Sequence, residues 1–147
     1  MQRLTVELGR ILHSSLYQRL ISFCDQYTPE FPSDAVVTGW LNSFFLSDGN
    51  IHILVNINEQ YKITAHCLVT IQEYYNKRAV ICHQMQDDNK SGKQIDEAVE
   101  YVKKLVDQVN AECSVITVSK NSKVYEKKYG YQVVRTVMIY RPGDNNE

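Results

Sequence analysis

One helical segment between two strand-like segments constrains this fold more than any other feature. Across residues 94–110, apolar side chains recur at steps of three and four, as they do along one face of an amphipathic helix. An apolar run that ends at Gln86 precedes this segment, and the short apolar run 115–119 follows it. A helix of this length between two strands usually acts as a crossover between parallel neighbours. The sequence therefore predicts a parallel strand pair inside a sheet.

The chain before this crossover predicts an antiparallel meander. Apolar residues alternate with other residues across 51–57 and again across 63–71, and a third strand covers about 79–86. The connections between these runs are short, as they are between consecutive antiparallel strands. After the crossover, a helix is predicted at 120–129 and a last strand at 133–140.

Two helices are predicted ahead of the sheet. Apolar residues recur mostly at steps of four across residues 5–25, which favours a helix. Leu4, Val6 and Leu8 also alternate with polar residues, so a short first strand stays an alternative. Two prolines end this segment, and a second helix is predicted at 35–46.

The composition fits one α/β domain with a mixed, α+β-type sheet. The chain has 147 residues, of which 44% are hydrophobic and 22% are charged. We expect a helical N-terminal part at 1–50, a sheet-forming part at 51–141 and a loose tail at 142–147. The formal net charge of -1 gives no bulk attraction to nucleic acid or to a membrane surface.

Targeting signals and metal motifs are not evident in the sequence. No apolar run approaches the roughly 20 residues of a membrane span, and the first residues lack an apolar signal core. The four cysteines have no zinc-ligand spacing, and His52 and His66 on separate polar-leaning strand faces are a weak metal signal. We therefore expect free thiols, a cytoplasmic location and no metal.

The loop ahead of the 94–110 helix is the first candidate site. It reads Asn-Lys-Ser-Gly-Lys-Gln from Asn89 to Gln94. A helix start offers unpaired N–H groups and a partial positive charge, which suit a pyrophosphate. Lys90 and Lys93 add positive charge. The alternative is a polar loop that only caps a surface helix.

The second candidate lies in the last third of the chain. Asn121 follows the predicted strand, the next helix carries Tyr125, and that helix ends at Gly130 and Tyr131. The alternative role of the tyrosines is packing of an amphipathic helix. The order of strand, loop, helix, strand, helix and strand, with these residues, resembles the acyl-CoA half of the GCN5-related N-acetyltransferase (GNAT) fold. The resemblance covers about residues 51–140.

The resemblance implies that acetyl-CoA binds as a cofactor. The GNAT loop usually reads Gln/Arg-x-x-Gly-x-Gly/Ala; Gly92 matches the first glycine, whereas Asn89 and Gln94 stand at the outer positions. The residues that the resemblance assigns to cofactor binding are Met85, Gln86, Ser91, Gly92, Lys93, Gln94 and Asn121.

The resemblance also implies a reaction, the transfer of an acetyl group from acetyl-CoA to an amine. Tyr125 is then the catalytic acid that protonates the departing thiolate. The family tyrosine usually lies four residues before the glycine, where this chain has Glu126. The family base is often a carboxylate on the fourth strand, or a water. The equivalent strand has no carboxylate there, and we expect its His83, on one face with Ile81 and Met85, to be a core or edge histidine.

Two other functions stay open. One is a GNAT-fold protein without catalysis that serves as a structural, assembly or binding module, alone or as a homo-oligomer. Small virus-encoded members of the fold often depart from the motifs in this way, so this hypothesis includes a phage or virion protein. The other is an unrelated α+β regulatory module. The sequence leaves the amine acceptor unnamed.

Overall fold

A computed structural model describes residues 1–46, 49–118, 122–134, 138, 140 and 142–143 of the chain. The chain divides into two compact units, Met1–Thr117 and Val118–Glu147, and each is described by itself. The assignment of the whole chain to one domain stays a prediction. No helix among the described residues is both long and apolar enough to cross a membrane.

Five strands of the first unit form one mixed sheet in the order β1-β2-β3-β4-β5. They are β1 (Gln2–Arg3), β2 (Ile51–Ile57), β3 (Ile63–Tyr74), β4 (Lys77–Asp87) and β5 (Cys113–Ile116). Neighbouring strands pair antiparallel from β1 to β4, whereas β4 and β5 pair parallel. The helix α4 (Lys93–Gln108) joins these last two strands, so the predicted meander, crossover and parallel pair are confirmed.

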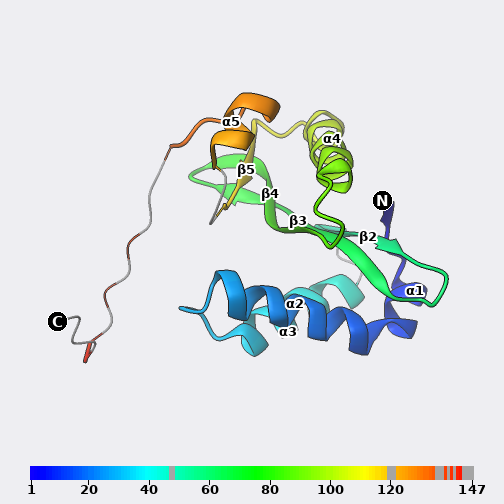
Figure 1. Ribbon diagram of the computed structural model, residues 1–147. Helices are drawn as coiled ribbons and strands as arrows, with labels where there is room; N and C mark the ends of the chain where they lie inside the picture. The colour runs from blue at the N-terminus through cyan, green and yellow to red at the C-terminus, as the bar shows by residue number, and fades with distance from the viewer. Residues whose placement is uncertain (47–48, 119–121, 135–137, 139, 141, 144–147) are drawn as a thin grey trace. The chain divides into compact units, whose positions relative to one another are not determined.

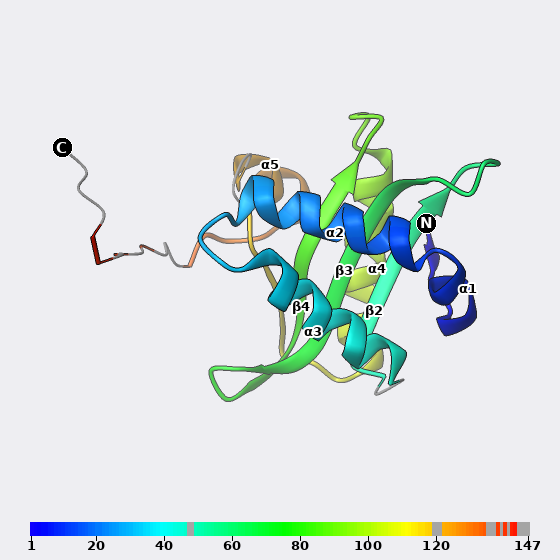
Figure 2. The ribbon, with the colours of Figure 1, turned by 90° about the horizontal axis from the view of Figure 1, so that it is seen from below.

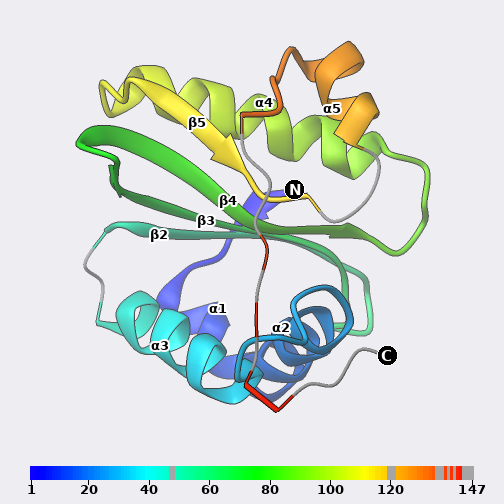
Figure 3. The ribbon, with the colours of Figure 1, turned by 90° about the vertical axis from the view of Figure 1, so that its left-hand side faces the viewer.

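Helices cover both faces of this sheet (Figures 1 and 3). Those on one face are α1 (Val6–Ile11), α2 (His13–Tyr27) and α3 (Ser33–Phe45), and α4 lies on the other. Figure 2 shows α2 and α3 lying across the strands. The single helix predicted at residues 5–25 is therefore two helices, α1 and α2. The alternative of a short first strand is met by β1, which precedes the alternating residues Leu4, Val6 and Leu8.

The sheet separates two apolar clusters, one under each helical layer. Ile53 and Val55 of β2 pack in the cluster with α1–α3, whereas Leu54 between them packs in the cluster with α4. Both faces of the central strands are therefore buried. His52 and His66 are only 5% and 0% exposed, so the polar-leaning faces on which we expected them are covered by helices.

The second unit contains α5 (Ser122–Tyr129), which agrees with the predicted helix. The strand predicted at 133–140 is absent from residues 131–134, 138 and 140, and the rest of it lies outside the described residues. A strand needs a neighbour for its backbone hydrogen bonds, and the described part of this unit has no other strand. Val134 and Met138 are 78% and 91% exposed. Of the predicted loose tail, only residues 142–143 are described, and they form a turn.

Candidate functional site

β4 leaves β5 part of the way along its length. Pairing between the two strands ends at Cys82 and Ile116, whereas β4 continues to Asp87. The register with β3 shifts at the same place, so that His83 is an extra residue of β4. Such a bulge bends its strand and increases the local twist, which accounts for the parting. Beyond Cys82, β4 pairs with β3 alone among the described residues of the first unit. We call the edge of β4 that has no strand partner in this unit the open edge.

The bulge also changes which side chains share a face. His83 Nε2 lies 2.8 Å from Thr70 Oγ1, and its ring lies 5.3 Å from the ring of Trp40 in α3. Gln84 contacts α2 on the same side of the sheet, whereas Met85 packs in the cluster with α4. The expectation that His83 and Met85 share a face is therefore wrong, because the bulge puts the consecutive residues His83 and Gln84 on the same face and Met85 on the other. Burial lowers the pKa of His83 to about 4.

Asp87 organises the loop that follows β4. Its carboxylate accepts hydrogen bonds from the N–H of Asn89 at 3.0 Å and from the hydroxyl of Ser91 at 3.3 Å. Its carbonyl accepts from the N–H of Lys90 at 3.2 Å. Lys90 and Gly92 both have positive φ, 55° and 78°, which turns the chain tightly into α4.

The start of α4 presents free backbone donors. Gly92 is the N-cap residue, and no heavy atom lies within 4 Å of the place where a side chain would begin. The first N–H with a helical acceptor is that of Asp96, which donates to Gly92 O. Among the described residues, nothing accepts from the N–H groups of Gly92, Gln94 and Ile95. Unpaired donors and the partial positive charge of a 16-residue helix therefore converge here.

The predicted cofactor residues are partly brought together. Those in the first unit, Met85, Gln86, Ser91, Gly92, Lys93 and Gln94, lie at the end of β4 and the start of α4. The Oε1 atom of Gln94 is buried and has no hydrogen-bond partner among the described residues. Asn121 lies outside the described residues. Tyr125 belongs to α5, where its ring lies 5.5 Å from that of Tyr129. The cofactor and catalytic roles stay predictions.

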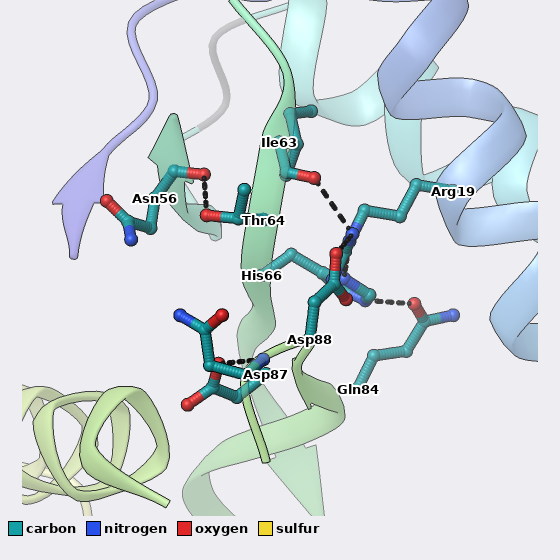
Figure 4. A network of polar contacts seen from close by, with 9 residues as sticks. Arg19, Asn56, Ile63, Thr64, His66, Gln84, Asp87 and Asp88 are labelled. Atoms are coloured by element: carbon teal, nitrogen blue, oxygen red, sulfur yellow. Dashed lines mark hydrogen bonds and ion pairs between the residues drawn. The ribbon is translucent and has the colours of Figure 1, made fainter. Parts of the chain in front are cut away.

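A polar network that the sequence did not predict anchors the same loop (Figure 4). Arg19 of α2 donates from Nε to His66 Nδ1 at 2.6 Å. Its two terminal nitrogens donate to the carboxylate of Asp88 at 3.0 and 2.8 Å, and one of them also donates to Ile63 O at 3.0 Å. In the sequence, the network is marked only by the cationic Arg19 next to Leu20, a buried residue of α2. Long polar side chains are common at such positions, so this is a weak signal.

His66 takes part in this network as a neutral imidazole. Its Nδ1 accepts from Arg19, so its proton lies on Nε2, which donates to Gln84 Oε1 at 2.9 Å. Burial, and then the charge of Arg19, lower the pKa of His66 to about 3. The hydrogen bonds from Arg19 lower the pKa of Asp88, which keeps the carboxylate charged.

The fold is that of GNAT-type acetyltransferases. No protein-family model and no curated protein matches the sequence. A predicted acetyltransferase from Clostridium acetobutylicum, crystallised with acetyl-CoA, matches with a TM-score of 0.68 and 16% identity over 95% of this chain and 94% of that chain. A probable acetyltransferase matches with a TM-score of 0.65 and 14% identity over 99% and 98%. Glucosamine-6-phosphate N-acetyltransferase from Arabidopsis thaliana matches with a TM-score of 0.62 and 16% identity over 97% of both chains.

Proposed function

We propose that the chain is a GNAT-like N-acyltransferase that transfers the acetyl group of acetyl-CoA to an amine. The observation that carries the proposal is the parting of β4 from β5 directly ahead of a helix start with free N–H groups. An open strand edge suits an extended ligand with amide groups, such as pantetheine, because backbone groups recognise it as they do an added strand. The helix start suits the diphosphate. Bound acetyl-CoA would supply the activated acetyl thioester.

The residues at the loop fit this cofactor. The open space at Gly92 lets a phosphate approach the backbone closely. In the loop, Lys90 and the neighbouring Lys93 offset the charge of Asp87, and the charge of Asp88 is paired with Arg19. Asp96 adds one negative charge in the first turn of α4. Gln94 Oε1 has no donor among the described residues, and an N–H or O–H of the bound ligand would satisfy it.

The side chains near the bulge favour an amine that arrives neutral or loses its proton to water. His83 is the imidazole at the bulge, and its pKa of about 4 makes it a weak proton acceptor. An alkylammonium with a pKa near 10 would lose its proton to this imidazole at a cost of about 8 kcal/mol. We therefore assign His83 no part in removing the proton. Tyr125 is proposed as the acid for the thiolate.

Acetyl-CoA is expected to raise the melting temperature of the protein. At about 100 times its dissociation constant, a ligand that binds only the folded state stabilises it by about 2.7 kcal/mol. The measurement is a thermal scan with and without acetyl-CoA, and ATP serves as the control because it carries adenine and phosphates without pantetheine. An unchanged melting temperature at millimolar acetyl-CoA would contradict the proposal. An equal shift with ATP would show that pantetheine adds nothing to binding, so the open edge of β4 would have no part in the site.

Gly92→Asp is expected to weaken acetyl-CoA binding at least about tenfold. The carboxylate would stand against phosphate at the helix start, and the positive φ of 78° would strain any side chain. Isothermal titration gives the affinity. Gly92→Ala measures the strain alone, and Gly39→Asp adds the same charge at an open glycine of α3. If Gly92→Asp binds as tightly as Gly39→Asp, the loop plays no part in binding.

A further inference from the structure

We infer that Arg19 is a positioning residue for the cofactor loop, residues 87–92. It fixes Asp88, and through Asp88 it holds the loop in the shape that presents the N–H groups of Gly92 and Gln94. This inference rests on the proposed function, because it assigns those N–H groups to acetyl-CoA. It adds a residue from α2, a helix with no part in the loop motif.

One guanidinium joins three parts of the first unit: α2, β3 and the loop. Arg19 binds Asp88 through both terminal nitrogens, Ile63 O at the start of β3, and His66 inside β3. Paired hydrogen bonds between guanidinium and carboxylate fix orientation as well as distance. The Arg19 side chain is 13% exposed and that of Asp88 is 39% exposed, so the pair lies at the surface on its aspartate side and solvent screens it there.

The donors of Arg19 are almost fully committed to protein partners. A guanidinium has about five N–H donors, and Nε, both hydrogens of Nη1 and one of Nη2 have acceptors here. The network continues behind Arg19, because Gln84 accepts from His66 and donates to Leu20 O and Cys24 Sγ of α2. His66 and Gln84 therefore fix the position of Arg19, and Arg19 affects ligand binding through Asp88.

The loop has few other ties to the rest of the unit. The hydrogen bonds made by Asp87 to Asn89, Lys90 and Ser91 all lie inside the loop. Outside it, two contacts lie at the ends of the loop: Asp87 pairs with Ala65 of β3, and Ser91 Oγ and Gly92 O accept from N–H groups of α4. Between these ends, Asp88 donates its N–H to Thr64 O, and its carboxylate accepts from Arg19. A loop that is already ordered pays less conformational entropy when a ligand binds. Releasing Asp88 should therefore cost affinity.

The test is a double-mutant cycle read out as acetyl-CoA affinity. Arg19→Gln and Asp88→Asn should each weaken binding about tenfold, and the double variant should bind no more weakly than either single one. Val37→Ala, a fully buried truncation in α3, serves as the control for lost stability. It should lower the melting temperature while acetyl-CoA affinity stays at the wild-type value. Arg19→Lys should recover only part of the affinity, because an ammonium lacks the paired donors.

Hydrogen exchange tests the same inference in the free protein. Arg19→Gln should speed the exchange of the Asp88, Asn89 and Lys90 amides and leave the β2 amides unchanged. Unchanged affinity in Arg19→Gln, additive losses in the double variant, or equal weakening by Val37→Ala would overturn the positioning role. A wild-type protein that binds no acetyl-CoA would overturn the proposed function as well, whereas wild-type binding with unaltered variants overturns the positioning role alone.

Discussion

Tyr125→Phe is expected to lower the rate of acetyl transfer by about 10²–10⁴-fold, the usual cost of losing a catalytic acid. The affinity for acetyl-CoA should not change, because the substitution removes one hydroxyl and keeps the ring. That ring lies 5.5 Å from the ring of Tyr129 and 6.5 Å from that of Tyr131, so its packing within the second unit survives. The measurement is kcat with a panel of amines, together with acetyl-CoA affinity by titration.

Tyr129→Phe is the matched control for Tyr125→Phe, since it makes the same change on the same helix. An equal rate loss in both variants, or none in Tyr125→Phe, would remove Tyr125 from the mechanism. A wild-type protein that binds acetyl-CoA but acetylates no polyamine, peptide or aminoglycoside would favour the alternative of a non-catalytic GNAT-fold module. That alternative includes an assembly role or a place in a virion.

The elements of the sheet were predictable because burial leaves a periodic mark on the sequence. Apolar residues occupy every second position of β2, whose Ile53 and Val55 face the cluster with α1–α3, and they recur at steps of three and four in α4, which is buried along one face. The crossover followed from their order, because a helix between two strands of one sheet favours a parallel pair. The loop residues of the candidate site were predictable for a simpler reason, as they are consecutive in the chain.

The features missed are those that depend on distant partners. The bulge at His83 arises from the register of β4 against β3, and no local pattern marks one extra residue in an apolar run. The strand predicted at 133–140 has the right alternation, but alternation supplies no neighbour for the backbone. The contact between Arg19 and Asp88 joins residues 69 positions apart, so it requires the fold itself.

The buried His66 and the half-buried His83 predict a steep loss of stability in mild acid. The pKa values of His66 and His83, about 3 and about 4, lie below the ordinary value of 6.5, so both stay neutral in the folded protein where the unfolded chain binds protons. Their contribution to stability is therefore complete above pH 6.5 and is lost as the pH falls toward 4 and then 3. Between pH 7 and pH 5, each histidine is expected to cost about 2 kcal/mol, because one pKa unit corresponds to about 1.4 kcal/mol.

The lost stability has a structural cause that a substitution can isolate. A proton on Nδ1 of His66 would set an N–H against the N–H of Arg19, which now donates to that nitrogen. His66→Asn keeps a hydrogen-bond acceptor at this place but does not titrate. Between pH 6 and pH 5, the slope of its unfolding free energy against pH should therefore be smaller than that of the wild type by about 1.4 kcal/mol per pH unit. Urea unfolding at pH 7, 6 and 5 measures both slopes, and His13→Asn, which removes an exposed imidazole, is the control. Equal slopes in the wild type and His66→Asn would show that His66 is not held neutral by the fold.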